Sequence, residues 1–150
     1  MPCDTKLVQN RELLGNAVKA AIFAVEGASF VMNQYQAKNI INLAVTGHGG
    51  AGKTSLAEAM LYLSGVSDRR GKVGDGNTVC DYDPEEIRRK ASISAAVAPL
   101  EWKNKKINLL DAPGLFDFEG GTCEAMRAAV TVLVVVSGRD GVAVGTEKAF

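Results

Sequence analysis

The sequence predicts a three-layer α/β fold in which a mostly parallel sheet ends in an antiparallel hairpin at one edge. A buried strand over residues 40–46 leads through a glycine-rich turn into an amphipathic helix over 53–63. Residues 130–136 form an apolar, valine-rich run with the composition of a central parallel strand. Two shorter strands lie between these elements, and Pro99 in the first restricts that strand to a sheet edge.

Length, charge and hydropathy exclude several classes of protein. The chain has 150 residues, 47% of them apolar, and its 17 basic residues balance 17 acidic ones. Disordered chains combine low hydropathy with high net charge, and this chain has neither. A net charge of zero also provides no general attraction to nucleic acid or to an anionic membrane. We therefore expect one domain of modest size that binds neither DNA nor a membrane. We also expect its complete form to be monomeric.

The cysteines and the hydropathy pattern indicate a cytoplasmic protein. Cys3, Cys80 and Cys123 lie far apart, and their odd number argues against a disulfide framework. No CxxC pair or Cys/His cluster in the sequence suggests zinc. No run reaches the roughly 18 apolar residues of a membrane-spanning helix. Reduced thiols in the cytoplasm are the simplest interpretation.

Residues 1–38 differ from the rest of the chain and are expected to form a helical extension of unknown function. Leu14, Val18 and Ile22 recur at helical spacing. Met32 precedes the first strong strand, and it is either the natural start of the protein or a loop residue.

The first helix of the regular part is expected to cover residues 53–63. Its predicted apolar face consists of Leu56, Ala59, Met60 and Leu63. A long polar segment over 64–92 follows, and a loop of this length inside a compact domain is usually functional or mobile. Within it, Asp83 and Pro84 predict a helix start, because Asp caps helices and Pro favours the first turn.

The second half is expected to contain a hairpin, a short helix and the valine-rich strand. Residues 93–97 and 107–111 pair as antiparallel strands across a polar turn at 103–106. A helix over 120–129 then leads into the strand at 130–136.

Gly47 to Thr54 matches the phosphate-binding pattern G-x-x-x-x-G-K-[ST]. Its place between a buried strand and a helix is the context in which the pattern binds phosphate. Glycines let backbone N–H groups curl around a phosphate, and the helix N-terminus adds partial positive charge. Lys53 can reach the terminal phosphates, where it stabilises developing charge, and the Thr54 hydroxyl can hold Mg²⁺. A glycine-rich turn that binds nothing is the alternative. We predict a P-loop NTPase fold, with phosphate-binding residues His48, Gly49, Gly50, Ala51, Gly52, Lys53, Thr54 and Ser55.

The only histidine, His48, lies inside this loop. It is either a catalytic base or a structural loop residue. We favour the structural interpretation, because nothing nearby in the sequence would orient the ring.

Asp111 ends a predicted strand and opens the sequence Asp-Ala-Pro-Gly. A carboxylate at the C-terminal tip of a strand beside the phosphate-loop strand faces the ligand crevice and can hold the metal opposite Thr54. Gly114 can donate its N–H to a terminal phosphate, which makes it a second candidate catalytic residue beside Lys53. The alternative is an ordinary turn, for which Pro and Gly are common residues.

From Asn39 to Phe150 the sequence resembles the start of the GTP-binding domain of translational GTPases, nearest to elongation factor G and its paralogues. The phosphate loop is similar to the family's Gly-His-x-Asp-x-Gly-Lys-Thr, and Asp111–Gly114 to its Asp-Thr-Pro-Gly. Arg89–Ile93 stands where the family has Arg-Gly-Ile-Thr-Ile, and Gly71–Gly76 looks like the entry to the first switch. The resemblance implies a partial GTP-binding domain over 39–150 that binds GTP or GDP with Mg²⁺ and acts on the ribosome. It also implies that Ser92 replaces the switch threonine as a metal ligand.

Three departures from the family pattern bear on function. Leu115 stands where the family has a histidine that positions the attacking water, and Lys90 and Ala91 replace its Gly and Ile. The chain contains no Asn-Lys-x-Asp, so guanine specificity is implied by resemblance alone. Without further strands the run at 130–136 would be an exposed edge, so we expect the chain to be a truncated, N-terminal part of a longer protein.

The sequence leaves three functional hypotheses. The first is a GTPase of the elongation factor G type. The second is a nucleotide-binding module with little turnover, which the leucine at 115 favours. The third is an ATP-using P-loop enzyme, against which the switch-like segment over 65–92 argues.

Overall fold

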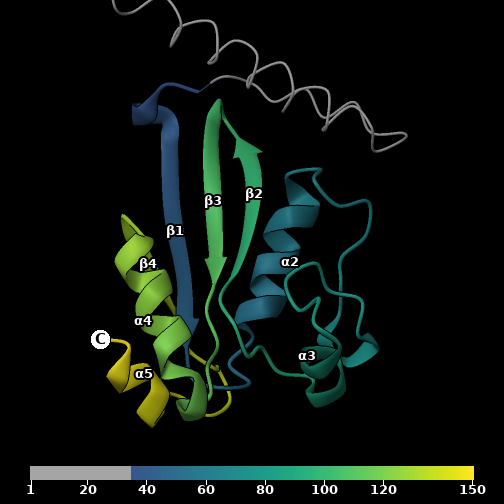
Figure 1. Cartoon of the computed structure of the whole chain (residues 1–150), viewed down its shortest axis with the longest axis vertical. Coiled ribbons are helices and arrows are strands. Elements are labelled where there is room, and N and C mark those ends of the chain that lie inside the picture. The colour runs from purple at the N-terminus through teal and green to yellow at the C-terminus, as the bar shows by residue number, and fades with distance from the viewer. Residues whose placement is uncertain (1–34) are drawn as a thin grey trace, which may run out of the picture. The chain divides into compact units, whose positions relative to one another are not determined.

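The computed structural model describes residues 35–150, so almost all of the expected helical extension over 1–38 lies outside the described residues. The described part contains one mixed sheet with strand order β2-β3-β1-β4 (Figure 1). Its strands are β1 (Ile40–Gly47), β2 (Ala96–Trp102), β3 (Lys105–Asp111) and β4 (Thr131–Val135). β1 runs parallel to β3 and β4, whereas β2 pairs antiparallel with β3 at one edge. The predicted mixed sheet with an edge hairpin is confirmed.

Four α-helices and three single-turn 3₁₀ helices accompany the sheet in the described residues. The α-helices are α2 (Lys53–Leu63), α3 (Pro84–Arg89), α4 (Glu119–Ala128) and α5 (Val144–Lys148). The 3₁₀ turns are η1 (Ala37–Asn39), η2 (Val73–Asp75) and η3 (Phe116–Phe118). Among residues 35–150, none of the helices combines the length and the apolar character that crossing a membrane requires.

Two apolar clusters on opposite faces of the sheet produce the three predicted layers. Successive strand residues point to opposite faces, and the neighbours Ala44 and Val45 of β1 belong to different clusters. Val45 packs with Leu61 of α2, whereas Ala44 packs with Ala125 of α4. β1 is therefore covered on both faces at the point where it enters the phosphate loop.

The buried face of α2 agrees with the prediction at Met60, which packs against the core, and differs from it elsewhere. The predicted face consisted of Leu56, Ala59, Met60 and Leu63. In the structure Ala57 and Leu61 are fully buried, while Leu63 is 72% exposed. The phosphate loop determines this orientation, because it fixes Thr54 inward at the start of the helix. The positions one and two turns on from Thr54 are then Glu58 and Leu61, so these side chains face the sheet.

The hairpin is tighter than expected and its first strand begins later. β2 starts at Ala96, so residues 93–95 lie outside the strand. The turn consists of Lys103 and Asn104 alone, with φ of 47° and 62°. Positive φ at both central residues is the geometry of the two-residue turn that matches strand twist. The edge position expected from Pro99 is confirmed.

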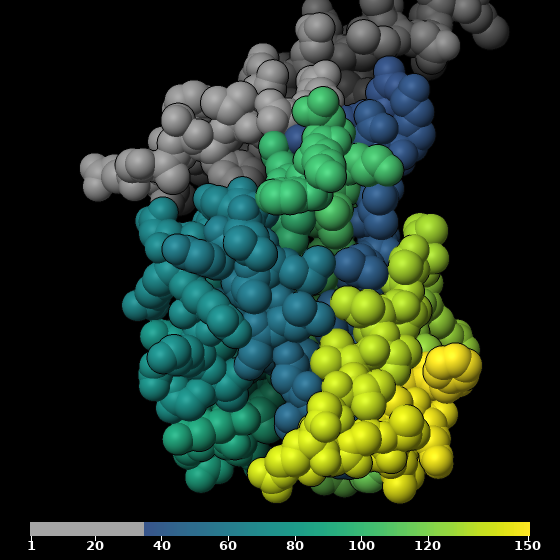
Figure 2. Space-filling model, turned by 180° about the vertical axis from the view of Figure 1, so that it is seen from behind, coloured from purple at the N-terminus to yellow at the C-terminus, as the bar shows by residue number. Residues whose placement is uncertain are grey.

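The valine-rich strand has the composition of a central strand but lies at the edge of the described sheet, as expected for residues 130–136 without further strands. β4 pairs with β1 only, and Val130 just before it is 81% exposed. Figure 2 shows this segment in yellow-green on the surface of the described residues. The composition of this segment is typical of a strand buried between two neighbouring strands, but composition alone does not determine whether a second neighbouring strand is present.

Candidate functional site

The phosphate loop connects the end of β1 to the start of α2 and borders a pocket of about 230 Å³. Gly52 caps α2 in a left-handed conformation, with φ of 95°, which glycine adopts without strain. The predicted phosphate-binding residues that line this pocket are Gly49, Gly50, Gly52, Lys53, Thr54 and Ser55. His48 and Ala51 do not line it. The other walls come from the segment over 73–92 and from the Asp-Ala-Pro-Gly loop.

Lys53 is buried at the base of this pocket, and its Nζ donates a 3.0 Å hydrogen bond to the carbonyl oxygen of His48. Burial lowers the pKa of the Lys53 ammonium, although the Asp111 and Asp81 carboxylates act in the opposite direction. Gly114 passes so close that a side chain there would collide with Lys53 Nζ. The two residues predicted to act on the terminal phosphate therefore lie together.

The predicted metal residues Thr54 and Ser92 are also together. Their hydroxyl oxygens are 3.3 Å apart, and Ser92 Oγ donates a 2.7 Å hydrogen bond to Asp81 Oδ1. Because the single hydroxyl proton of Ser92 goes to Asp81, Thr54 is the donor in the Thr54–Ser92 contact. Sequence analysis did not identify Asp81. The only feature of the sequence that could have indicated Asp81 is its position two residues before the helix cap Asp83.

Asp111 lies at the end of β3, directly opposite Val45 of β1, and is 1% exposed. Neither of its carboxylate oxygens has a hydrogen-bond partner, and Asp81 Oδ2 is likewise buried without one. Burial raises the pKa of Asp111 to about 6, an effect that the Asp81 charge increases and that the nearby Thr54 hydroxyl and Lys53 charge oppose. Burial also raises the pKa of Asp81. Unpartnered buried carboxylate oxygens are costly unless a cation binds them, so these residues fit a metal.

Glu58 of α2 holds the polar segment against the helix, which sequence analysis did not predict. It is fully buried, and its Oε1 accepts hydrogen bonds from the N–H groups of Val79 at 2.6 Å and Cys80 at 3.2 Å. The next residue, Asp81, is thereby placed beside the phosphate loop.

Glu86 of α3 fixes the other end of the same segment. Its Oε1 accepts hydrogen bonds from the N–H groups of Ile93 at 2.9 Å and Ser94 at 3.1 Å, while Oε2 accepts from the Asp83 N–H. The predicted Asp83 cap is confirmed, since its Oδ1 accepts from the Glu85 N–H at 2.7 Å. Glu86, which takes part in this cap, therefore also positions Ser92, the residue just before Ile93.

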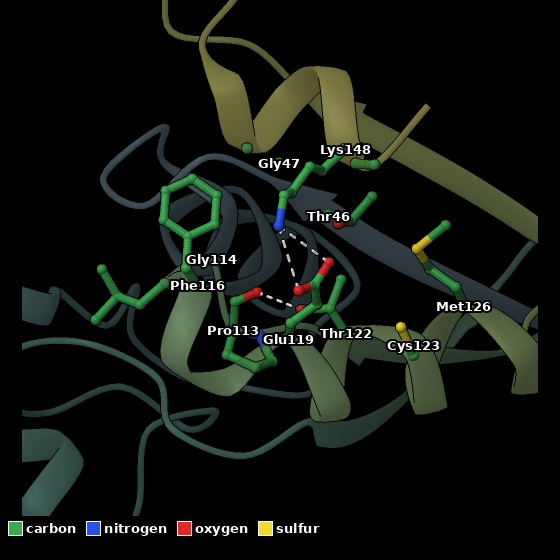
Figure 3. A pocket seen from close by; sticks show the side chains of 13 residues that line it. Thr46, Gly47, Pro113, Gly114, Phe116, Glu119, Thr122, Cys123, Met126 and Lys148 are labelled. Carbon is green, nitrogen blue, oxygen red and sulfur yellow. Dashed lines mark hydrogen bonds and ion pairs between the residues drawn. The ribbon is translucent and has the colours of Figure 1, made fainter.

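A second pocket of about 120 Å³ lies between α4, α5 and the loop after β3 (Figure 3). Lys148 reaches across it to Glu119 at 3.4 Å and lies 5.0 Å from the centre of the Phe116 ring. Thr122 donates a 2.7 Å hydrogen bond to the Pro113 carbonyl oxygen. These contacts join α5 to the segment that carries Gly114.

His48 lies close to this second group of residues. Its ring centre is 6.2 Å from that of Phe116, and Nδ1 is buried without a hydrogen-bond partner. No carboxylate among residues 35–150 is bonded to Nδ1. This arrangement supports a structural role for His48.

Comparison with known proteins identifies the family. The model of the elongation factor Tu GTP-binding domain matches residues 38–150. The chain belongs to the family of translational GTPases.

Individual members of the family are also similar to the chain. An elongation factor G-like protein from Mycobacterium tuberculosis is 40% identical over 119 residues, covering 79% of this chain and 17% of that protein. A mitochondrial ribosome-releasing factor 2 from Scheffersomyces stipitis is 36% identical, covering 79% and 14%. A crystal structure from Thermus thermophilus superposes with a TM-score of 0.71 at 46% identity, covering 73% of this chain and 17% of that one. The translational GTPase chain described here thus spans less than a fifth of the length of these relatives.

Proposed function

We propose that this chain is the nucleotide-binding part of an elongation factor G-like GTPase that binds GTP or GDP with Mg²⁺ and acts on the ribosome in the cytoplasm. The observation that carries the proposal is the group formed by Thr54, Ser92, Asp81 and Asp111 beside Lys53 at the phosphate loop. Two hydroxyls and two carboxylates next to a phosphate-binding lysine are the donors that a Mg²⁺–nucleotide complex uses.

Magnesium would be held by the Thr54 and Ser92 hydroxyls, with Asp81 and Asp111 as carboxylate partners. Within the described residues, no group of three or more His, Cys, Asp or Glu side chains could hold a metal. Mg²⁺ is commonly held by one or two carboxylates together with substrate phosphates, so this donor set suits a metal that arrives with a nucleotide. When bound, it would supply positive charge to the phosphate oxygens.

For hydrolysis, the protein's contribution would be electrostatic. Lys53 and the backbone N–H groups of the phosphate loop and Gly114 would stabilise charge that develops during in-line attack of water on the terminal phosphate. Leu115 cannot orient that water, because its side chain neither donates nor accepts a hydrogen bond. We therefore propose that hydrolysis is slow unless another group positions the water.

Two alternatives remain distinguishable by experiment. A binding module with little turnover would retain the pocket and lack hydrolysis, and Leu115 favours it. An ATP-using enzyme would prefer adenine nucleotides, and the match to a GTP-binding domain argues against it.

The test is a titration of the purified chain, with Mg²⁺, against a fluorescent guanine nucleotide in competition with GDP and ADP. We expect displacement by GDP but not ADP, and loss of binding in Lys53→Ala. Equal displacement by both would contradict guanine specificity. Unchanged binding in Lys53→Ala would contradict the site itself. Single-turnover hydrolysis then separates a GTPase from a binding module.

A further inference from the structure

Lys90 ends α3 in a backbone conformation that suits glycine. Its φ is 54° and its ψ is 39°, in the left-handed region. The β-carbon makes this region unfavourable for lysine, and residues held in such conformations cluster at binding and catalytic sites. Glycine accepts the same backbone conformation, so the Lys90 side chain can be removed there without strain.

The Lys90 side chain also differs from its two basic neighbours in having no protein partner. Arg88 and Arg89 both pair with Glu85, at 2.6 Å and 2.5 Å. Among residues 35–150, Lys90 forms no side-chain hydrogen bond or ion pair. The Lys90 ammonium is therefore available to a ligand.

Lys90 lines the nucleotide pocket together with Lys53, Ser92 and Gly114, the residues that mark the place of the metal and the terminal phosphate. The one positive charge of Lys53 is near two carboxylates, Asp81 and Asp111, so these three groups alone do not attract an anionic ligand. The Mg²⁺ that these carboxylates would hold offsets their charge, and a terminal phosphate would gain from one further cation in the pocket. Lysine, a compact charge on a flexible stem, can provide it.

We propose that the Lys90 ammonium binds the terminal phosphate of the nucleotide and makes the site prefer the triphosphate over the diphosphate. This inference rests on the proposed function and adds a specificity-determining residue to it. Lys90 lies two residues before Ser92, so the same short segment would supply both the hydroxyl for the metal and the charge for the phosphate.

The test compares the dissociation constants of GDP and of a non-hydrolysable GTP analogue, with Mg²⁺, in Lys90→Gly and Lys90→Arg. Glycine removes the ammonium and accepts the left-handed backbone, so folding is preserved, and a melting curve verifies this. Lys103→Gly is the matched control, because Lys103 also has a positive φ, 47°, and is an exposed lysine in the turn of the hairpin.

We expect Lys90→Gly to weaken binding of the GTP analogue on the order of tenfold, as for a lost charge-assisted hydrogen bond, and to leave GDP binding unchanged. Lys90→Arg should retain the preference, and Lys103→Gly should change neither constant. Equal weakening of both nucleotides, or no weakening at all, would overturn the inference and leave the proposed function intact. Failure of the unsubstituted protein to bind either nucleotide would overturn both.

Discussion

Ser92 Oγ donates its hydrogen bond to Asp81 Oδ1 at 2.7 Å, which joins two residues of the polar segment that lie eleven positions apart. The bond turns the Ser92 hydroxyl oxygen toward Thr54, so that its remaining lone pair is presented at the phosphate loop. Asp81 therefore orients the hydroxyl that we propose as a metal ligand, and its negative charge acts to raise the pKa of Lys53.

Replacing Asp81 by asparagine should weaken the affinity for the magnesium that supports nucleotide binding. The partners of metal ligands typically contribute 10–100-fold to affinity, so the Mg²⁺ concentration for half-maximal nucleotide retention should rise by about tenfold. Magnesium titration at fixed nucleotide concentration measures this. Asp75→Asn makes the same charge change at an exposed position of η2 and should leave the midpoint unchanged. Equal midpoints in the two variants would remove Asp81 from the metal site.

Leu115→His should accelerate hydrolysis. The Leu115 side chain lies against Gly49 of the phosphate loop and lines the nucleotide pocket, so a histidine there would reach the same space with a group that can orient water. Positioned acid–base groups typically contribute about 10²–10⁴-fold, and we expect the lower end of that range. Single-turnover GTP hydrolysis is the measurement. Leu115→Ala should give no acceleration. A rate unaffected by Leu115→His, and already as fast as in a histidine-bearing relative, would show that the leucine is no impediment.

Truncating Glu58 to alanine should destabilise the fold through the polar segment. The N–H groups of Val79 and Cys80 would lose their acceptor, and a buried unsatisfied group costs about 1–3 kcal/mol. Urea unfolding gives the free-energy change, and limited proteolysis should show earlier cleavage between residues 65 and 92. Glu124→Ala, on the exposed side of α4, provides the reference for a helical glutamate without such bonds. Similar losses in both variants would contradict the role assigned to Glu58.

The metal-free protein should show a pH dependence that originates at Asp111. Burial raises its pKa from 3.8 to about 6, so the folded state holds this proton more tightly than the unfolded chain. The resulting contribution to stability is lost as pH rises from about 4 to about 6 and stays lost above that range. Asp111→Asn removes the effect, so the variant should gain up to about 3 kcal/mol over the unsubstituted protein between pH 4 and 7. Urea unfolding in EDTA tests this. A difference that does not change with pH would contradict it.

Sequence patterns predicted the helices, strands and turns well where neighbouring residues in the chain determine them. The strand, loop and helix around Lys53, the Asp83 cap and the edge position of Pro99 all follow from neighbouring residues. The face of α2 did not follow, because the phosphate loop at its N-terminus determines the helix rotation. Leu63 continues the apolar pattern and nevertheless lies in solvent.

The candidate site was predictable only in part for a related reason. Thr54 and Asp111 occur in recognisable motifs. Asp81, by contrast, bonds to Ser92, 11 positions away, and Glu58 bonds to Val79, 21 positions away. In a sequence, a glutamate on a helix indicates a solvent-exposed face. Burial of Glu58 depends on a segment folding back over the helix, which no local pattern encodes.

Two neighbouring strands of the described sheet, β1 and β4, differ in how readily their backbone can open. β1 is hydrogen-bonded on both sides and covered on both faces, whereas β4 has one bonded neighbour among residues 35–150. In hydrogen exchange, amide protons of β4 should therefore be replaced through small local openings, and the β1 amide protons that bond to β3 only when the whole domain unfolds. The phosphate loop follows the strand that holds the slowest-exchanging amides, so its shape would persist while the neighbouring edge strand β4 frays.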